Sequence, residues 1–169
     1  MKFRLFIICI LLILLVGCSN NVKKEMSLSQ YNEYKGVYDL IESQEEFLTS
    51  SNYFDVEVEI VESEKGKYLY YVFIDNPRNE MYDVEAMVVE EDSNFNDVVF
   101  PTIGIIDNEK YNLVPSNSNF DEGFVKGLVL SGETYLKDSY NFKINLTWNG
   151  LSSEDKRFSE FISITKEME

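Results

Sequence analysis

The stretch Tyr140-Asn-Phe142-Lys-Ile144-Asn-Leu146-Thr-Trp148 decides the fold class. Apolar and polar side chains alternate strictly along it, and this period of two is the pattern of a strand that buries one face. It is the clearest of several such segments in the chain. We therefore expect a mainly β protein in which this segment lies against a core.

The same period recurs along most of the chain. From Asp55 to Ile60, three acidic residues alternate with Val56, Val58 and Ile60, which predicts a half-buried strand with an acidic outer face. Turn residues such as Gly66, Pro77, Gly132 and the pair Asn149-Gly150 separate the segments. The expected strands are 56–60, 68–74, 81–89, 98–106, 111–114, 124–130, 140–148 and 158–165.

These segments have no helical pattern between them. Parallel strands need long crossover connections, so the pattern favours an antiparallel β-sandwich of about seven or eight strands. Segment 68–74 is apolar at nearly every position, and we expect it to be buried on both faces. Burial in a core accounts for most of the 11 Tyr and 12 Phe, and a surface tyrosine patch is the alternative.

A helix is expected at 27–49, ahead of the strands. Ser27-Leu28-Ser29-Gln30 has the spacing of a capping box, and Met26 with Tyr31 is placed for a hydrophobic staple. Apolar residues then recur in steps of three and four through Leu48, which predicts one face packed on the sheet.

The N-terminus has the features of a secretory signal. Lys2 and Arg4 precede twelve apolar residues from Leu5 to Val16. This run is shorter than the roughly 20 residues that a permanent membrane-spanning helix requires. We therefore expect residues 1–17 to be a signal peptide.

The run ends in Leu15-Val16-Gly17-Cys18, which resembles the lipobox of bacterial lipoproteins. The resemblance implies that Leu15, Val16 and Gly17 are recognised by a signal peptidase that cuts after Gly17. It also implies a diacylglyceryl group on the Cys18 thiol, and it allows fatty acylation such as palmitoylation of the new amino group. The chain would then be anchored in a membrane by its lipid without spanning it.

Two further features resemble immunoglobulin-like domains of small Gram-positive lipoproteins. Asn76-Pro77 follows one strand, and the run from Gly127 to Glu133 precedes the strand that ends in Trp148. The resemblance implies an immunoglobulin-like sandwich at 53–166, and the helix and sandwich together are expected to form a single domain at 27–169. Before it, the polar run from Ser19 to Glu25 predicts a flexible lipidated tether at 18–26. The alternative fold is a cystatin-like α+β unit, with the helix across one curved sheet.

Charge and composition exclude several classes of function. The chain has 30 acidic and 15 basic residues and no histidine. A net charge of −15 repels nucleic acid, and the missing imidazole removes serine–histidine and cysteine–histidine catalysis and histidine metal ligands. Removing Lys2 and Arg4 with the signal leaves 13 basic against 30 acidic residues, a net charge of −17.

Three motifs carry candidate chemistry, and none is complete. The segment Gly127 to Thr134 has the glycine spacing of a phosphate-binding loop, but Glu133 stands where lysine is needed, which argues against nucleotides. The segments 92–97 and 117–123 begin like calcium loops but lack the closing glutamate. Carboxylate-pair hydrolysis has no marked spacing in a chain this acidic.

We therefore expect a lipid-anchored extracytoplasmic protein on the cell membrane, acting as a non-catalytic binding or accessory module. No catalytic residue, metal site or cofactor is predicted apart from the covalent lipid on Cys18. Extracytoplasmic proteins or glycans are the expected partners. The alternatives are a small carboxylate-dependent hydrolase and a calcium-binding surface domain.

Overall fold

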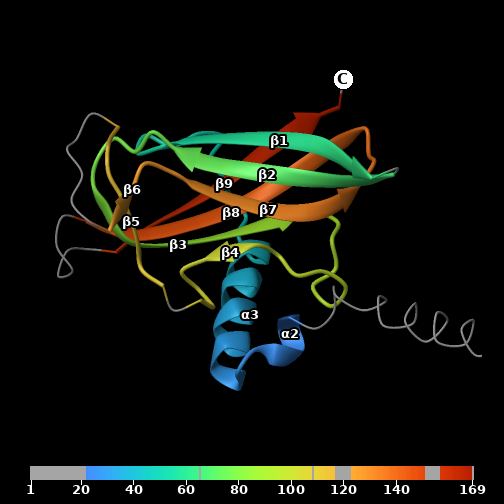
Figure 1. Cartoon of the computed structure of the whole chain (residues 1–169), viewed down its shortest axis with the longest axis horizontal. Helices are drawn as coiled ribbons and strands as arrows, with labels where there is room; N and C mark the ends of the chain where they lie inside the picture. The colour runs from blue at the N-terminus through green and yellow to red at the C-terminus, as the bar shows by residue number, and fades with distance from the viewer. Residues whose placement is uncertain (1–21, 65, 108, 117–122, 151–156, 169) are drawn as a thin grey trace, which may run out of the picture.

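A computed structural model describes residues 22–64, 66–107, 109–116, 123–150 and 157–168. Within these ranges, two helices precede nine strands (Figure 1). The helices are α2 (Val22–Glu25) and α3 (Leu28–Glu42). The strands are β1 (Asp55–Glu64), β2 (Lys67–Asp75), β3 (Met81–Glu90), β4 (Thr102–Ile103), β5 (Tyr111–Leu113), β6 (Phe124–Val125), β7 (Leu128–Tyr135), β8 (Ser139–Asn149) and β9 (Arg157–Glu167).

The strands form two sheets. The smaller sheet has the order β1-β2-β7, and the larger has the order β6-β5-β3-β8-β9 with β4 also paired to β3. All strand pairs are antiparallel except β5 with β6. The order matches strands A, B and E facing strands C, F and G of an immunoglobulin domain. The predicted β-sandwich preceded by a helix is confirmed, and the single curved sheet of the cystatin-like alternative is wrong.

The main core lies between the two sheets. Strand β8 contributes Phe142, Ile144, Leu146 and Trp148, each buried, as its strict alternation predicted. The opposing sheet supplies Val72 and other inward-facing side chains of β1, β2 and β7. Alternation therefore predicted β8 and its buried face.

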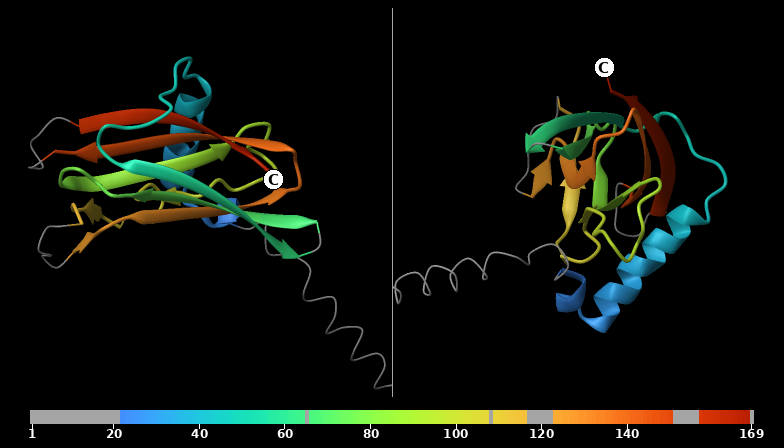
Figure 2. Two further views of the ribbon diagram at one scale, coloured as in Figure 1. Left: turned by 90° about the horizontal axis from the view of Figure 1, so that it is seen from above. Right: turned by 90° about the vertical axis from the view of Figure 1, so that its right-hand side faces the viewer.

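Helix α3 forms a third layer on the outer face of the larger sheet (Figures 1 and 2). Tyr34 and Ile41 of the helix are fully buried in a second cluster that includes Met87 and Val89 of β3. Strand β3 therefore has apolar side chains on both faces, one toward each core. Among the described residues, no helix is long and apolar enough to cross a membrane.

The start of α3 agrees with the sequence, and its end does not. The Ser27 hydroxyl accepts a hydrogen bond from the Gln30 N–H, and the Gln30 side chain accepts one from the Ser27 N–H, which completes the capping box. The helix ends at Glu42, not at residue 49. Leu48 instead pairs with Ile162 at the edge of β9, and this long-range pairing replaces the last expected helical turns.

The described part of the predicted tether at 18–26 is helical where a flexible segment was expected. Val22–Glu25 forms helix α2, and the Lys23 ammonium donates to the Phe95 carbonyl and lies 3.9 Å from the centre of the Phe95 ring. Met26 packs against the cluster beneath α3. The packed domain thus begins at about Val22.

Three strand predictions need correction. Segment 98–106 is mostly irregular, with only Thr102–Ile103 in β4, because its apolar residues bury beneath α3 without a strand partner. Segment 124–130 divides into β6 and β7, and Gly132 lies inside β7 instead of at a turn. Strand β2 buries only one face, because α3 covers β3 and β8 on the other side of the sandwich.

Candidate functional site

The predicted lipidation residues lie outside the described part of the chain. This applies to Cys18 and to the recognition residues Leu15, Val16 and Gly17. The described chain begins at Val22, four residues after Cys18, in helix α2. Helices α2 and α3 lie on one side of the molecule, and the β1-β2-β7 sheet forms the opposite side (Figure 1).

The outward side of the β1-β2-β7 sheet carries an aromatic row bordered by acids. We call it the acidic aromatic face. The strand register pairs Glu59 with Tyr71 and Glu57 with Phe73, and cross-strand partners project from the same side of a sheet. The face comprises Leu69, Tyr71 and Phe73 of β2, Asp75 at its end, Asp55, Glu57, Glu59 and Val61 of β1, and Val129, Ser131 and Glu133 of β7.

Apolar surface on this face is open to solvent. Val129 is 51% exposed and Val61 is 42% exposed. The rings of Tyr71 and Phe73 are half-buried against their neighbours and stack at 6.4 Å between centres. None of the described helices and strands therefore covers the aromatic row of β2.

Most acids on the face form no ion pair within the described chain. In the described chain, no ion pair or side-chain hydrogen bond involves Glu57, Glu59, Asp75 or Glu133. Asp55 differs, because it accepts hydrogen bonds from Arg78 at 2.5 Å and from Asn76 at 2.7 Å. Four carboxylates thus form no ion pair within the described chain.

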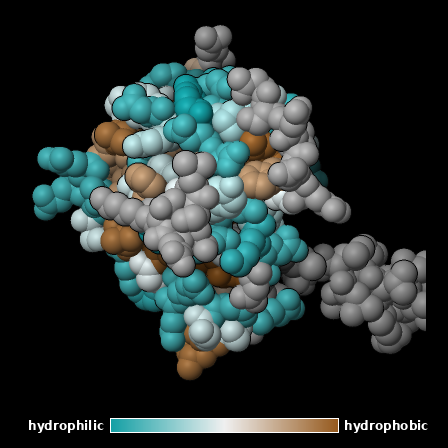
Figure 3. All heavy atoms as spheres, turned by 90° about the vertical axis from the view of Figure 1, so that its left-hand side faces the viewer, coloured by the Kyte–Doolittle hydropathy of each residue, from teal (hydrophilic) through white to brown (hydrophobic). Residues whose placement is uncertain are grey.

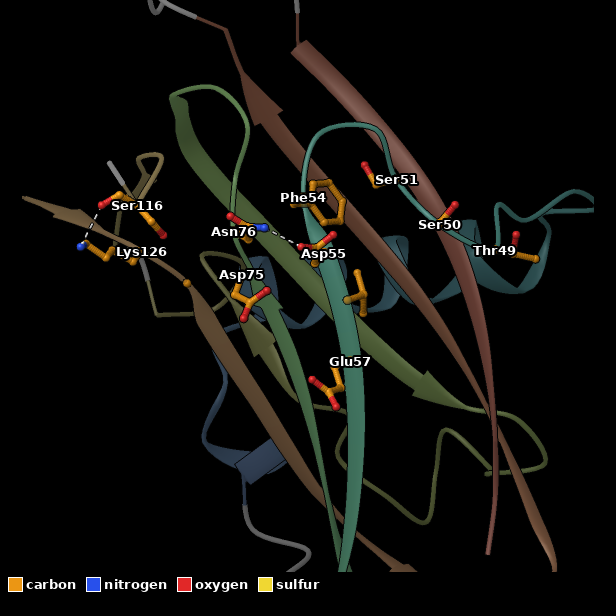
Figure 4. A pocket seen from close by; sticks show the side chains of 12 residues that line it. Thr49, Ser50, Ser51, Phe54, Asp55, Glu57, Asp75, Asn76, Ser116 and Lys126 are labelled. Carbon is orange, nitrogen blue, oxygen red and sulfur yellow. Dashed lines mark hydrogen bonds between the residues drawn. The ribbon is translucent and has the colours of Figure 1, made fainter. Parts of the chain in front are cut away.

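An open hollow of about 770 Å³ adjoins the face at the start of β1 (Figure 4). Thr49, Ser50 and Ser51 line one side of Asp55, and Ser116 and Lys126 line the other. The Lys126 ammonium donates to the Ser116 carbonyl at 3.1 Å. Figure 3 looks onto this end of the molecule, where hydrophilic residues separate small hydrophobic patches.

One carboxylate of the hollow, that of Asp55, lies in an environment that favours its charged form. Hydrogen bonds from Arg78 and Asn76 hold the pKa of Asp55 below its ordinary value. A general acid in glycoside hydrolysis needs the opposite shift, so that it keeps a proton near neutral pH. The chemistry of Asp55 is therefore that of an ionised hydrogen-bond acceptor.

The motifs considered for nucleotides and calcium adopt other structures. Residues 128–134 lie in the regular strand β7, so they form no phosphate-binding loop. In segment 92–97 the Asn94 side chain accepts the Asn96 N–H within a turn. Most of the second calcium candidate, residues 117–122, lies outside the described chain. Within the described ranges, no group of three or more acidic or cysteine side chains could hold a metal.

The sequence did not predict one buried charged group, the carboxylate of Glu90. Glu90, at the end of β3, is only 4% exposed and accepts hydrogen bonds from Thr134 at 2.7 Å and from Lys137 at 2.8 Å. The contact with Thr134 joins the two sheets, so the buried Glu90 carboxylate has a structural role. Its neighbours come from distant parts of the chain, and no local pattern marks it.

The acidic aromatic face was predicted only in part. The alternation in β1 indicated its acidic residues, whereas the aromatic row of β2 was interpreted as buried. The chain matches no protein-family model, no curated protein and no solved structure.

Proposed function

We propose that the chain is a bacterial lipoprotein, held by a diacylglyceryl group on Cys18 at the outer side of the cytoplasmic membrane. Its domain acts there as a non-catalytic binding or accessory module. The observation that carries the proposal is Leu15-Val16-Gly17-Cys18 directly after a twelve-residue apolar run with basic residues before it.

The architecture supports display of the domain close to a membrane. Helix α2 begins four residues after Cys18, so the packed domain starts within about 14 Å of the lipidated residue at full extension. Two acyl chains hold a protein on a bilayer more firmly than one, since each buried methylene contributes about 0.8 kcal/mol. A short connection with a strong anchor keeps the domain at the membrane surface.

The surface supports binding more than catalysis. The acidic aromatic face offers solvent-accessible apolar area with unpaired charge, which is typical of an interaction surface. A carboxylate-dependent hydrolase would use the hollow beside Asp55, where the lowered pKa opposes acid catalysis. Calorimetric titration with calcium is expected to show no stoichiometric micromolar binding, and such binding would favour the calcium-binding alternative.

Replacing one cysteine tests the anchor. In cells supplied with a labelled fatty acid, the wild-type protein should incorporate label, and Cys18→Ser should lose it and accumulate as a precursor that retains residues 1–17. The physical reason is that a hydroxyl is a far weaker nucleophile than a thiol for accepting the lipid.

Cys9→Ser is the matched control, because Cys9 lies inside the apolar run and has no predicted role. This variant should be labelled and processed like the wild type. Undiminished label on Cys18→Ser would contradict the proposal.

A further inference from the structure

We propose that the acidic aromatic face binds an extended, arginine-rich segment of a protein partner, on the side of the domain that points away from the membrane. The orientation in this inference rests on the proposed lipid anchor. The chemistry of the face does not depend on the anchor.

The fold fixes which side is free. The described chain begins in α2, which lies with α3 on one side of the molecule, and the β1-β2-β7 sheet lies beyond the larger sheet (Figures 1 and 2). Packed sheets are about 10 Å apart, and a helix with its side chains is about 10 Å thick. An anchor at Cys18 therefore places α2 and α3 toward the bilayer and the acidic aromatic face toward the exterior.

The charge of the face selects a cationic partner. Glu57, Glu59, Asp75 and Glu133 have no ion pair among the described residues, so covering them with an apolar or acidic surface would leave charges without compensation. A second copy of this chain would bring the same carboxylates against each other. A basic segment supplies the missing charge.

The spacing of the face selects arginine in an extended chain. Tyr71 lies opposite Glu59 and Phe73 lies opposite Glu57, which gives two ring–carboxylate pairs, two residues apart along the strands. A guanidinium can stack on a ring and donate to a neighbouring carboxylate at the same time, whereas a lysine ammonium cannot stack its charge in a plane. The repeat of roughly 7 Å equals the distance between alternate side chains of an extended peptide.

The test measures peptide binding to the full-length lipidated protein in phosphatidylcholine vesicles. The probe is a fluorescent peptide of four Arg-Thr repeats, and its controls are four Lys-Thr repeats and a peptide of equal composition with arginines in adjacent pairs. We expect the alternating arginine peptide to bind most tightly and to weaken as salt is added.

Variants of the face locate the binding. Tyr71→Leu and Phe73→Leu keep apolar volume but remove a ring, and each should weaken binding about 2- to 5-fold. Tyr71→Phe should bind within about twofold of the wild type, because the ring remains. Thermal unfolding of each variant establishes that the fold is retained.

A charge-matched pair separates specific binding from general attraction. Glu57→Gln with Glu59→Gln should weaken binding more than Glu33→Gln with Glu45→Gln, which removes the same charge from exposed positions in α3 and just after it. Equal losses in the two pairs, or undiminished binding by the ring variants, would overturn the proposal. So would tighter binding of a neutral oligosaccharide than of the arginine peptide.

The same titration in detergent distinguishes this inference from the proposed function. If the protein purified from cells carries no lipid, the anchor is refuted. Peptide binding by that chain in detergent would still uphold the chemistry of the face. Binding in detergent but not on vesicles would refute the orientation. Absence of binding in both, for a chain with lipid on Cys18, would refute the inference and leave the anchor standing.

Discussion

Tyr34 ties helix α3 to the segment that follows β3. Its hydroxyl accepts a hydrogen bond from the Phe100 backbone N–H at 2.7 Å, and the side chain is fully buried. Burial raises the pKa of Tyr34 to about 12. A single phenol thus satisfies a buried backbone donor and fills the second core.

We expect Tyr34→Phe to lower the free energy of unfolding by about 1–3 kcal/mol at pH 7, because the Phe100 N–H loses its partner in a buried site. The pKa is raised on folding, so this tyrosine stabilises the folded protein below pH 10. That stabilisation is lost as pH rises through about 12.

The difference between wild type and Tyr34→Phe should therefore narrow between pH 10 and about 12. Urea unfolding at a series of pH values measures this difference. A gap that stays constant or widens in this range would contradict the assigned environment of Tyr34.

At the scale of elements, two glycines have opposite surroundings. Gly36 lies in α3, where a Cβ would meet nothing within 4 Å. Gly132 lies in β7 opposite Tyr70, and a Cβ there would come within 2.4 Å of the Tyr70 ring. The ring folds over the glycine and packs against Phe142 at 4.7 Å between centres.

Gly36→Ala should raise the free energy of unfolding by about 0.5–1 kcal/mol, because alanine has less conformational freedom to lose in a helix. Gly132→Ala should lower it by about 1–3 kcal/mol, because the confined Tyr70 ring has to move. Thermal unfolding of the two variants under one condition compares them. Equal stability of Gly132→Ala and the wild type would show that the ring does not occupy this space.

Local patterns predicted the elements whose own residues carry the signal. The capping box at Ser27 predicted the start of α3, and alternation predicted β1 and β8. The end of α3 was missed because Leu48 continues the helical spacing, and its pairing with Ile162 depends on a strand more than a hundred residues away.

The candidate site also depends on contacts that a local sequence pattern does not show. The acids of β1 were expected to face outward, and they do. The aromatic row was missed because β2 is apolar on both sides, and its sequence cannot show which side the helix leaves uncovered. Only the order of the strands and the layer formed by α3 decide that Tyr71 and Phe73 face outward.

At the scale of the whole molecule, the three layers separate two roles. The proposed anchor joins the side formed by α2 and α3, and the acidic aromatic face occupies the opposite side (Figure 1). If the proposed signal is removed, the remaining net charge of −17 repels anionic surfaces such as acidic lipid headgroups. Basic partners are attracted by the same charge.

The most direct test of the anchor is the intact mass of the native protein purified from cell membranes. The account predicts a chain whose first residue is Cys18, heavier than its amino acids by a diacylglyceryl group or by that group with an added acyl chain. A product that retains residues 1–17 and carries an unmodified Cys18 thiol would contradict it.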